Sequence, residues 1–169
     1  NNSFSVIEAT SGSHLIGQPV VPAESFTAAN DLWRQYPGSM KDQTDWAFAS
    51  GINRLMFHTF QHQCLNDSLR PGITMGVYGV HWDRNQTWWN MAIGYHKYVA
   101  RCQYMLQQGR TVADILYLIP EGAPHVFRAP ASAIESIIPS MPDRKGYNFD
   151  ACPPSLLYKA TVKNGKIIL

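Results

Sequence analysis

Long hydrophobic runs, an excess of one charge sign and closely paired cysteines are all missing from this sequence of 169 residues. A transmembrane helix needs about 20 consecutive apolar residues, and because no such stretch occurs we predict no membrane span. The 14 basic and 12 acidic residues are spread along the chain and give a formal net charge of +2. Nucleic-acid binders usually concentrate Lys and Arg in a patch, so we expect no nucleic-acid partner.

Cysteine is scarce as well. Cys64, Cys102 and Cys152 are odd in number and widely spaced, which excludes a disulfide framework and a CxxC metal site. The metal ligands, if the protein has any, are not identified by this pattern.

The composition that remains is that of a globular protein. Hydrophobic residues make up 45% and charged residues 15%, enough apolar side chain for a core and too little charge to keep the chain unfolded. The chain begins at Asn1 rather than Met and stops on a strand-like run ending at Leu169. We therefore expect a fragment whose partners include the remaining domains of the same polypeptide.

Helix-like and strand-like segments alternate in the first part of the chain. Residues 6–16 have helical character, residues 20–23 form a short apolar run, residues 40–50 have helical spacing, and residues 52–60 are strand-like. The order helix, strand, helix, strand favours a parallel sheet or a β/α barrel.

A long loop and a strong helix follow. Residues 61–87 contain three glycines and many polar residues, which is typical of a long surface loop, and such loops are usually functional. Residues 88–108 carry apolar side chains at three- and four-residue spacing, with Gly109 as a C-terminal cap. Residues 112–119 then form an apolar strand.

The composition changes after Pro120 to Pro, Ala and Ser as far as Pro142. A short helix beginning at Pro153 and a final strand near Lys166 are expected beyond it. A new α/β unit therefore begins near Val112.

Glu24 is the first candidate for chemistry, because it directly follows the apolar run at residues 20–23. In β/α barrels the active site is built at the carboxyl ends of the strands, and a carboxylate there can act as a base or nucleophile in glycoside cleavage. The alternative is a strand-end Glu that caps the next turn or pairs with Arg34.

His58, His62 and Gln63 follow the next strand-like run. Imidazole and amide groups exchange hydrogen bonds with sugar hydroxyls, and neutral His can also bind a metal. A zinc-protease motif is excluded, because Thr59 stands where that motif needs Glu. An equally good interpretation is that these histidines lie inside the end of a barrel, where their hydrogen-bonding groups have partners within the protein.

The segment from His81 to Trp89 is the densest mixture of polar and aromatic residues. Hydrogen-bonding groups beside flat apolar faces are typical of polyol sites, which makes Arg84, Asn85 and Trp88 candidates for substrate binding. Helix capping is the alternative, since Asn85 or Thr87 can cap the helix that follows.

Several separated blocks in this order resemble the α-L-rhamnosidases of glycoside hydrolase family 106 and their close relatives. The blocks are Pro22-Ala23-Glu24-Ser25-Phe26-Thr27, Gly51-Ile52-Asn53-Arg54 with Phe57-His58 and His62-Gln63, Pro71-Gly72-Ile73-Thr74-Met75-Gly76, Arg84-Asn85-Gln86-Thr87-Trp88-Trp89, and the helix containing Tyr98 to Gly109. The resemblance covers most of residues 8–112 and, more loosely, residues 146–169.

This resemblance implies a long α/β enzyme built on a (β/α)8, TIM-type barrel, of which the chain supplies the last strands. Residues 1–111 would form the C-terminal part of the catalytic barrel with its long loop and closing helix. Residues 112–169 would be the incomplete beginning of a second α/β domain. Glu24 would end the seventh barrel strand, and residues 52–60 would form the eighth.

The resemblance also implies an inverting exo-acting glycoside hydrolase with Glu24 as the general base. Its acid partner would lie upstream, outside this sequence. The expected sugar-contacting residues are His58, His62, Gln63, Arg84, Asn85 and Trp88. A calcium ion near the sugar hydroxyls is implied by the family alone, with ligands that we cannot assign.

The expected substrate is an oligo- or polysaccharide with a terminal rhamnose or similar sugar, and the expected location is periplasmic or secreted. Two alternatives keep the same blocks: a glycosidase of other sugar specificity, and a non-catalytic carbohydrate-binding relative. A purely structural α/β scaffold is the third, and it predicts that His58, Arg84 and Trp88 are buried in the core.

Overall fold

The computed structural model describes residues 3–29, 33–119 and 147–169. They form two compact units: Val20–Gly109, and Asn1–Pro19 together with Arg110–Leu169. The later boundary lies close to the expected one between residues 111 and 112, but the first helix groups with the later segment rather than with the barrel part. Our division into domains 1–111 and 112–169 stays a prediction about the whole protein. The stretch rich in Pro, Ala and Ser lies outside the described residues.

In the unit Val20–Gly109, two parallel strands are joined through a helix. Strand β1 (Pro22–Ser25) pairs with β2 (Arg54–Phe57), with Pro22 opposite Arg54 and Ser25 opposite Phe57. Helix α2 (Pro37–Ala49) connects them, and α3 (Ile93–Leu106) follows the long loop. The predicted order of elements and the parallel pairing are confirmed, although both strands are shorter than their apolar runs.

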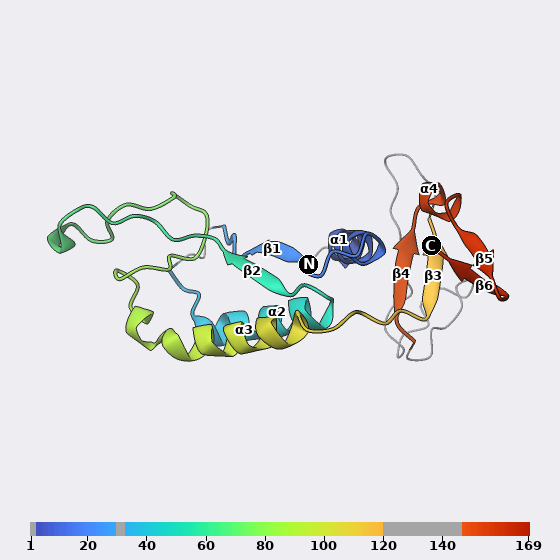
Figure 1. Ribbon diagram of the computed structural model, residues 1–169. Coiled ribbons are helices and arrows are strands. Elements are labelled where there is room, and N and C mark those ends of the chain that lie inside the picture. The colour runs from blue at the N-terminus through green and yellow to red at the C-terminus, as the bar shows by residue number, and fades with distance from the viewer. Residues whose placement is uncertain (1–2, 30–32, 120–146) are drawn as a thin grey trace, which may run out of the picture. The chain divides into compact units, whose positions relative to one another are not determined.

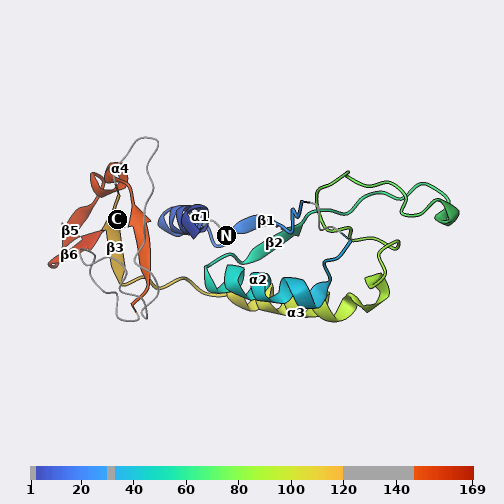
Figure 2. The same cartoon turned by 180° about the vertical axis from the view of Figure 1, so that it is seen from behind.

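Both helices lie on the same side of the strand pair (Figures 1 and 2). Leu55 and Phe57 of β2 pack against the core on that side. The core is formed by Phe26, Met40, Phe48, Val80, Trp82, Trp88, Ala92, Tyr95 and Val99. The other side of the pair carries Glu24 and Met56 and is exposed. The strand pair therefore has one packed face and one open face.

Glycines end the helices where the sequence predicted. Gly17, Gly51 and Gly109 have φ values of 71°, 99° and 80°, in the left-handed region that favours glycine. The predicted helix over residues 88–108 differs, because it begins with a 3-10 turn, η2 (Trp89–Met91), before α3. Another short turn, η1 (Asp67–Leu69), interrupts the long loop.

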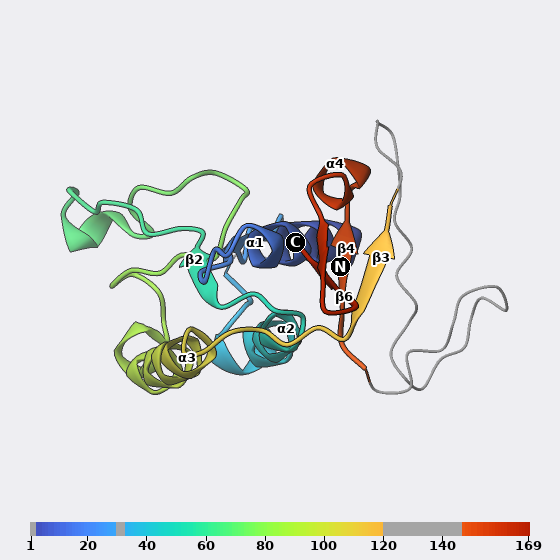
Figure 3. The ribbon, with the colours of Figure 1, turned by 45° about the vertical axis from the view of Figure 1, so that its right-hand side comes forward.

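The other unit is built on a second parallel pair (Figure 3). Strand β3 (Ile115–Leu118) pairs with β4 (Phe149–Cys152), and α1 (Ser3–Leu15) packs on β4. Ser11 Oγ accepts a hydrogen bond from the Ala151 amide at 3.0 Å. The imidazole of His14 lies 2.8 Å from the Asp150 carboxylate. These contacts explain why the first helix belongs to this unit.

Helix α4 (Pro154–Leu157) and a hairpin complete the unit. The hairpin consists of β5 (Thr161–Lys163) and β6 (Lys166–Ile168), and the turn residues Asn164 and Gly165 both have positive φ. We predicted α4 and β6 but not β4 or β5. The three cysteines, Cys64, Cys102 and Cys152, are free thiols in the structure. Within the described ranges, no helix has the length and hydropathy needed to cross a bilayer.

Candidate functional site

Glu24 lies at the carboxyl end of β1, on the open face of the strand pair. It is the third of the four strand residues, its neighbour in β2 is Met56, and its side chain is exposed. Met56 is 50% exposed, which is unusual for an apolar side chain in a parallel sheet. The Thr27 hydroxyl donates a hydrogen bond to Glu24 Oε1 at 2.9 Å, so one carboxylate oxygen is held.

Three segments meet beyond the strand ends. The Val80 amide lies within hydrogen-bonding distance of two carbonyl oxygens, 3.2 Å from that of Phe26 and 2.9 Å from that of His58. The Thr59 amide donates to the Val80 carbonyl at 2.9 Å, and the Trp82 amide donates to the Thr59 carbonyl at 3.2 Å. The returning end of the long loop is therefore attached directly to the carboxyl ends of both strands.

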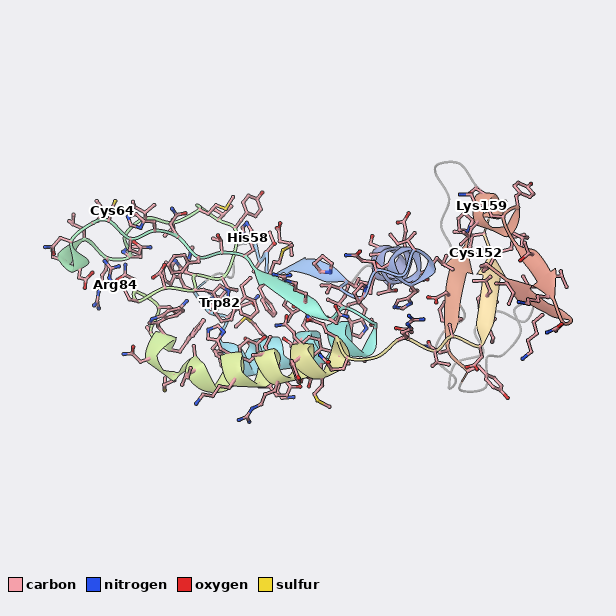
Figure 4. The ribbon with its side chains drawn as sticks, viewed as in Figure 1. His58, Cys64, Trp82, Arg84, Cys152 and Lys159 are labelled. Carbon is pink, nitrogen blue, oxygen red and sulfur yellow. The ribbon has the colours of Figure 1, made fainter. Side chains whose placement is uncertain are left out.

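His58 occupies the position that the sequence predicted, directly after β2. Its amide donates to the Ser25 carbonyl at 2.8 Å, so it lies at the same end of the sheet as Glu24. Its side chain is half-buried, and Nδ1 has no hydrogen-bond partner in the described part of the chain. A Cβ atom at Gly79 would lie 2.6 Å from this nitrogen. Figure 4 shows His58 at the end of β2. That His58 and Glu24 face one cavity remains a prediction.

Gln63 and Arg84 hold the long loop together. The side-chain amide of Gln63 donates to the Ile73 carbonyl at 2.6 Å and to Asp83 Oδ2 at 2.9 Å, and it accepts from the Ile73 amide at 2.9 Å. Arg84 donates to Asp67 Oδ1 at 3.0 Å and to the Gln63 carbonyl at 3.1 Å. The polar groups of Gln63 and Arg84 already make hydrogen bonds within the protein. Their predicted contacts with sugar would therefore be additional to a structural role.

Asn85, Trp88 and His62 differ in their surroundings. Asn85 Nδ2 donates to the Pro71 carbonyl at 3.1 Å. Trp88 is buried in the core, and its indole N–H donates to the Gln35 carbonyl at 2.9 Å. His62 is exposed. Trp88 is therefore buried, which is what the structural alternative predicted. Arg84 lies at the surface, and His62 lies where a ligand can reach it. Their roles in sugar binding remain predictions.

Buried polar atoms without a partner concentrate in this unit. Among the described residues of this unit, they are His58 Nδ1, both ring nitrogens of His81, Trp82 Nε1, Asn85 Oδ1 and Gln86 Nε2. Buried polar groups are almost always hydrogen-bonded. Sequence reasoning noticed the segment from His81 to Trp89 but did not select His81 or Gln86, because nothing in the residue types reveals burial.

Aromatic rings surround Trp82, in the segment from His81 to Trp89. Trp82 stacks on Phe57 with ring centroids 4.5 Å apart and also contacts Tyr95 and His96. Burial lowers the pKa of His96, because desolvation disfavours the imidazolium. Burial also lowers the pKa of His81, and the nearby carboxylate of Asp83 opposes that shift. Both imidazoles are therefore neutral near pH 7.

The family resemblance implies calcium, but in the described part of this chain no set of carboxylates forms a site for it. Ca²⁺ takes about six to eight oxygen ligands. Among the described residues no three His, Cys, Asp or Glu side chains gather as a metal site. Asp83 is buried, but its two oxygens accept from Gln63 Nε2 and the Asn85 amide. These residues do not form a calcium site by themselves, and calcium binding by the whole protein stays a prediction.

Glu24, the long loop and the aromatic residues around Trp82 all lie in a sequence that matches one protein family. The sequence fits the model of the α-L-rhamnosidases, glycoside hydrolase family 106, over residues 2–169. The chain belongs to the α-L-rhamnosidase family. The resemblance seen in the sequence is thereby confirmed.

Two relatives of this α-L-rhamnosidase family chain show how much of a protein it represents. It is 36% identical over 155 residues to a protein of Formosa agariphila provisionally named a β-glucuronidase, covering 92% of this chain and 12% of that protein. The solved structure of a rhamnosidase from Novosphingobium sp. PP1Y matches with a TM-score of 0.81 and 29% identity, over 98% of this chain and 15% of that one. The chain thus shares an α/β glycosidase fold and spans a small part of the length of these relatives.

Proposed function

We propose that this chain forms the last strands of the catalytic (β/α)8 barrel of an inverting, exo-acting α-L-rhamnosidase, with Glu24 as the general base. The observation that carries the proposal is the place of Glu24, an exposed carboxylate at the carboxyl end of a parallel strand in a chain of this family. Active sites of β/α barrels lie at that end. The open face bearing Glu24 and Met56 is the side that the remaining barrel strands would enclose.

The proposed chemistry assigns Glu24 one proton. Its carboxylate takes a proton from a water molecule as the water oxygen bonds to the anomeric carbon, and the glycosidic C–O bond breaks on the opposite side. A second carboxyl group, outside this sequence, protonates the leaving oxygen. Inverting enzymes hold the two groups about 6.5–9.5 Å apart to leave room for the water. The hydrogen bond from Thr27 to Oε1 leaves Oε2 without a partner among the described residues.

The substrate we propose is an oligo- or polysaccharide with a terminal rhamnose or similar sugar, and the partners are the remaining domains of the same polypeptide. His58, His62, Gln63, Arg84, Asn85 and Trp88 stay the proposed substrate-binding residues. A periplasmic or secreted location is also part of the proposal.

A glycosidase of other sugar specificity is the second candidate, and a specific observation favours it: the relative named as a β-glucuronidase is 36% identical to this chain. Both candidates use the same strand-end carboxylate, so the site described above does not separate them.

Hydrolysis of aryl glycosides by the full-length protein tests the proposal. We expect turnover of an aryl α-L-rhamnoside. Proton NMR should show that the first-formed sugar has the inverted anomeric configuration. Turnover of an aryl β-glucuronide in its place would select the second candidate. Binding of either sugar without turnover would identify a non-catalytic carbohydrate-binding relative.

A further inference from the structure

His81 carries the largest unmet hydrogen-bonding capacity in the described part of the chain. The side chain is fully buried, and neither Nδ1 nor Nε2 has a hydrogen-bond partner among the described residues. A buried polar group without a hydrogen-bond partner destabilises the folded protein. A hydrophobic residue would avoid that cost, so the imidazole needs a reason other than packing.

The position of His81 connects it with the strand ends. Its neighbours in sequence are the residues that attach the loop there, since Val80 bonds to the carbonyls of Phe26 and His58, and Trp82 bonds to that of Thr59. Phe26 is two residues beyond Glu24. His81 therefore belongs to the layer that lies directly above the carboxyl ends of β1 and β2.

A single aromatic ring covers His81 within the described residues. The Trp33 ring lies over the imidazole, with centroids 4.2 Å apart and planes inclined by 37°. Trp33 is 38% exposed, so a ligand in solution can reach part of this residue. If the Trp33 side chain rotates when a ligand binds, the indole can remain beside the imidazole as a surface for an apolar sugar face.

The chemistry of the imidazole selects the ligand class. Because burial keeps His81 neutral, one ring nitrogen donates a hydrogen bond and the other accepts one. A sugar hydroxyl can donate or accept, and a polyol can therefore satisfy either nitrogen or both. A bound metal ion is not favoured, because no further His, Cys, Asp or Glu ligands gather around it in the described residues.

We propose that His81, covered by Trp33 in the free protein, binds a hydroxyl group of the sugar and thereby contributes to substrate recognition. This inference rests on the proposed function, because it takes the glycan substrate as the ligand. It adds a residue that sequence reasoning did not select. It also explains why two hydrogen-bonding atoms are kept buried and unpaired.

The test measures binding and stability together in the full-length protein. Glu24→Gln serves as the parent, so that the probe, L-rhamnose, can be titrated calorimetrically without turnover of contaminating glycosides. In this parent, His81→Phe should weaken L-rhamnose binding about tenfold, the value of one hydrogen bond. Its melting temperature should be unchanged or higher, because the substitution removes two unsatisfied buried nitrogens. His81→Gln, which keeps a donor and an acceptor, should restore part of the affinity.

Different failures give different results. A His81→Phe protein that binds L-rhamnose within twofold of the parent overturns the proposal, while hydrolysis by the unmodified enzyme still upholds the proposed function. A lower melting temperature with unchanged binding would show that the imidazole is satisfied inside the protein, by a buried water molecule. If neither the unmodified enzyme nor the parent recognises rhamnosides, both proposals fail.

A chemical measurement covers the case in which His81→Phe does not fold. Diethyl pyrocarbonate modifies neutral, accessible imidazoles, and peptide mass spectrometry locates the adduct. Trp33→Ala should accelerate modification of His81, and L-rhamnose should slow it. Modification at a rate that L-rhamnose does not alter would contradict the inference. Modification of N-acetylhistidine added to the same sample provides the control for reagent activity.

Discussion

We expect His96 to make the stability of this protein depend on pH. The imidazole of His96 packs among aromatic rings, with centroids 5.5 Å from Phe57 and 5.3 Å from Trp82, and burial lowers its pKa below the ordinary value of 6.5. The unfolded chain therefore binds a proton more readily than the folded chain does. Stability from this group is complete above about pH 6.5 and declines as the pH falls below it.

We expect His96→Phe to reduce the acid sensitivity of the full-length protein. The melting temperature of the unmodified protein should fall more between pH 7.5 and pH 5.5 than that of the variant, because Phe needs no proton and fits the aromatic surroundings. His62→Gln is the matched control, since it also removes an imidazole, but from an exposed position. An equal acid shift in the unmodified protein and His96→Phe would contradict this account of His96.

At the scale of single residues, the polar side chains show how much of the site could be predicted from the sequence. Glu24 and His58 were placed correctly because strand ends follow from short apolar runs. The hydrogen bonds of Gln63 and Arg84 depend instead on the path of a loop with no periodic pattern. The burial of His81 under Trp33 has the same origin. Residue types therefore identified the polar segment, but not which of its members remain free to bind a ligand.

At the scale of the elements, the path by which the long loop returns to the ends of β1 and β2 depends on Gly79. Gly79 has a φ of 85°, and a Cβ there would lie 2.6 Å from His58 Nδ1 and 3.0 Å from the His58 carbonyl oxygen. Gly76 has a φ of 69°, but a Cβ there would meet nothing within 4 Å. Both positions carry the cost of a left-handed conformation, about 1–2 kcal/mol for a residue with a side chain. Contact with the backbone of His58 is added only at Gly79.

Gly79→Ala should therefore destabilise the full-length protein by about 1–3 kcal/mol more than Gly76→Ala, the usual range for overpacking. Because the collision involves His58, Gly79→Ala should also lower kcat/KM, whereas Gly76→Ala should not. Chemical unfolding and steady-state kinetics of the two variants provide the comparison. Equal effects would show that the loop adapts and that the close approach to His58 is unimportant.

Secondary structure was predictable where a local signal exists. Gly17, Gly51 and Gly109 ended their helices as expected, because a left-handed residue is a local requirement. Strand β4 was missed because its hydrogen bonds and packing come from β3 and α1, far away in the sequence. The hairpin of β5 and β6 did have a local signal, Asn164-Gly165 between apolar residues, and that signal was overlooked.

For the molecule as a whole, the open face of the strand pair is the main feature. Exposed Met56 and Glu24 share it, and the chain covers only 15% of the rhamnosidase with the similar structure. A parallel strand pair is normally covered on both faces. We infer that the remaining polypeptide covers this face and supplies the second carboxyl group.

Expressed alone, these 169 residues should show no glycosidase activity and should be poorly stable. Unpaired strand edges promote aggregation, and the inverting cleavage that we propose needs two carboxyl groups, of which the proposal assigns only Glu24 to this chain. Size-exclusion chromatography, thermal unfolding and an aryl rhamnoside assay check this expectation. A monomer that unfolds cooperatively and hydrolyses the rhamnoside at a rate near that of a full-length relative would contradict it.

The role of Glu24 is tested most directly by the kinetics of Glu24→Gln in the full-length enzyme on an aryl α-L-rhamnoside. The amide keeps the shape of the side chain and can still interact with the Thr27 hydroxyl, but it cannot accept a proton from water. We predict a loss of kcat of about 10²–10⁴-fold, the usual contribution of a general base, with substrate binding largely retained. A loss of less than about tenfold would contradict the assignment of Glu24 as the base.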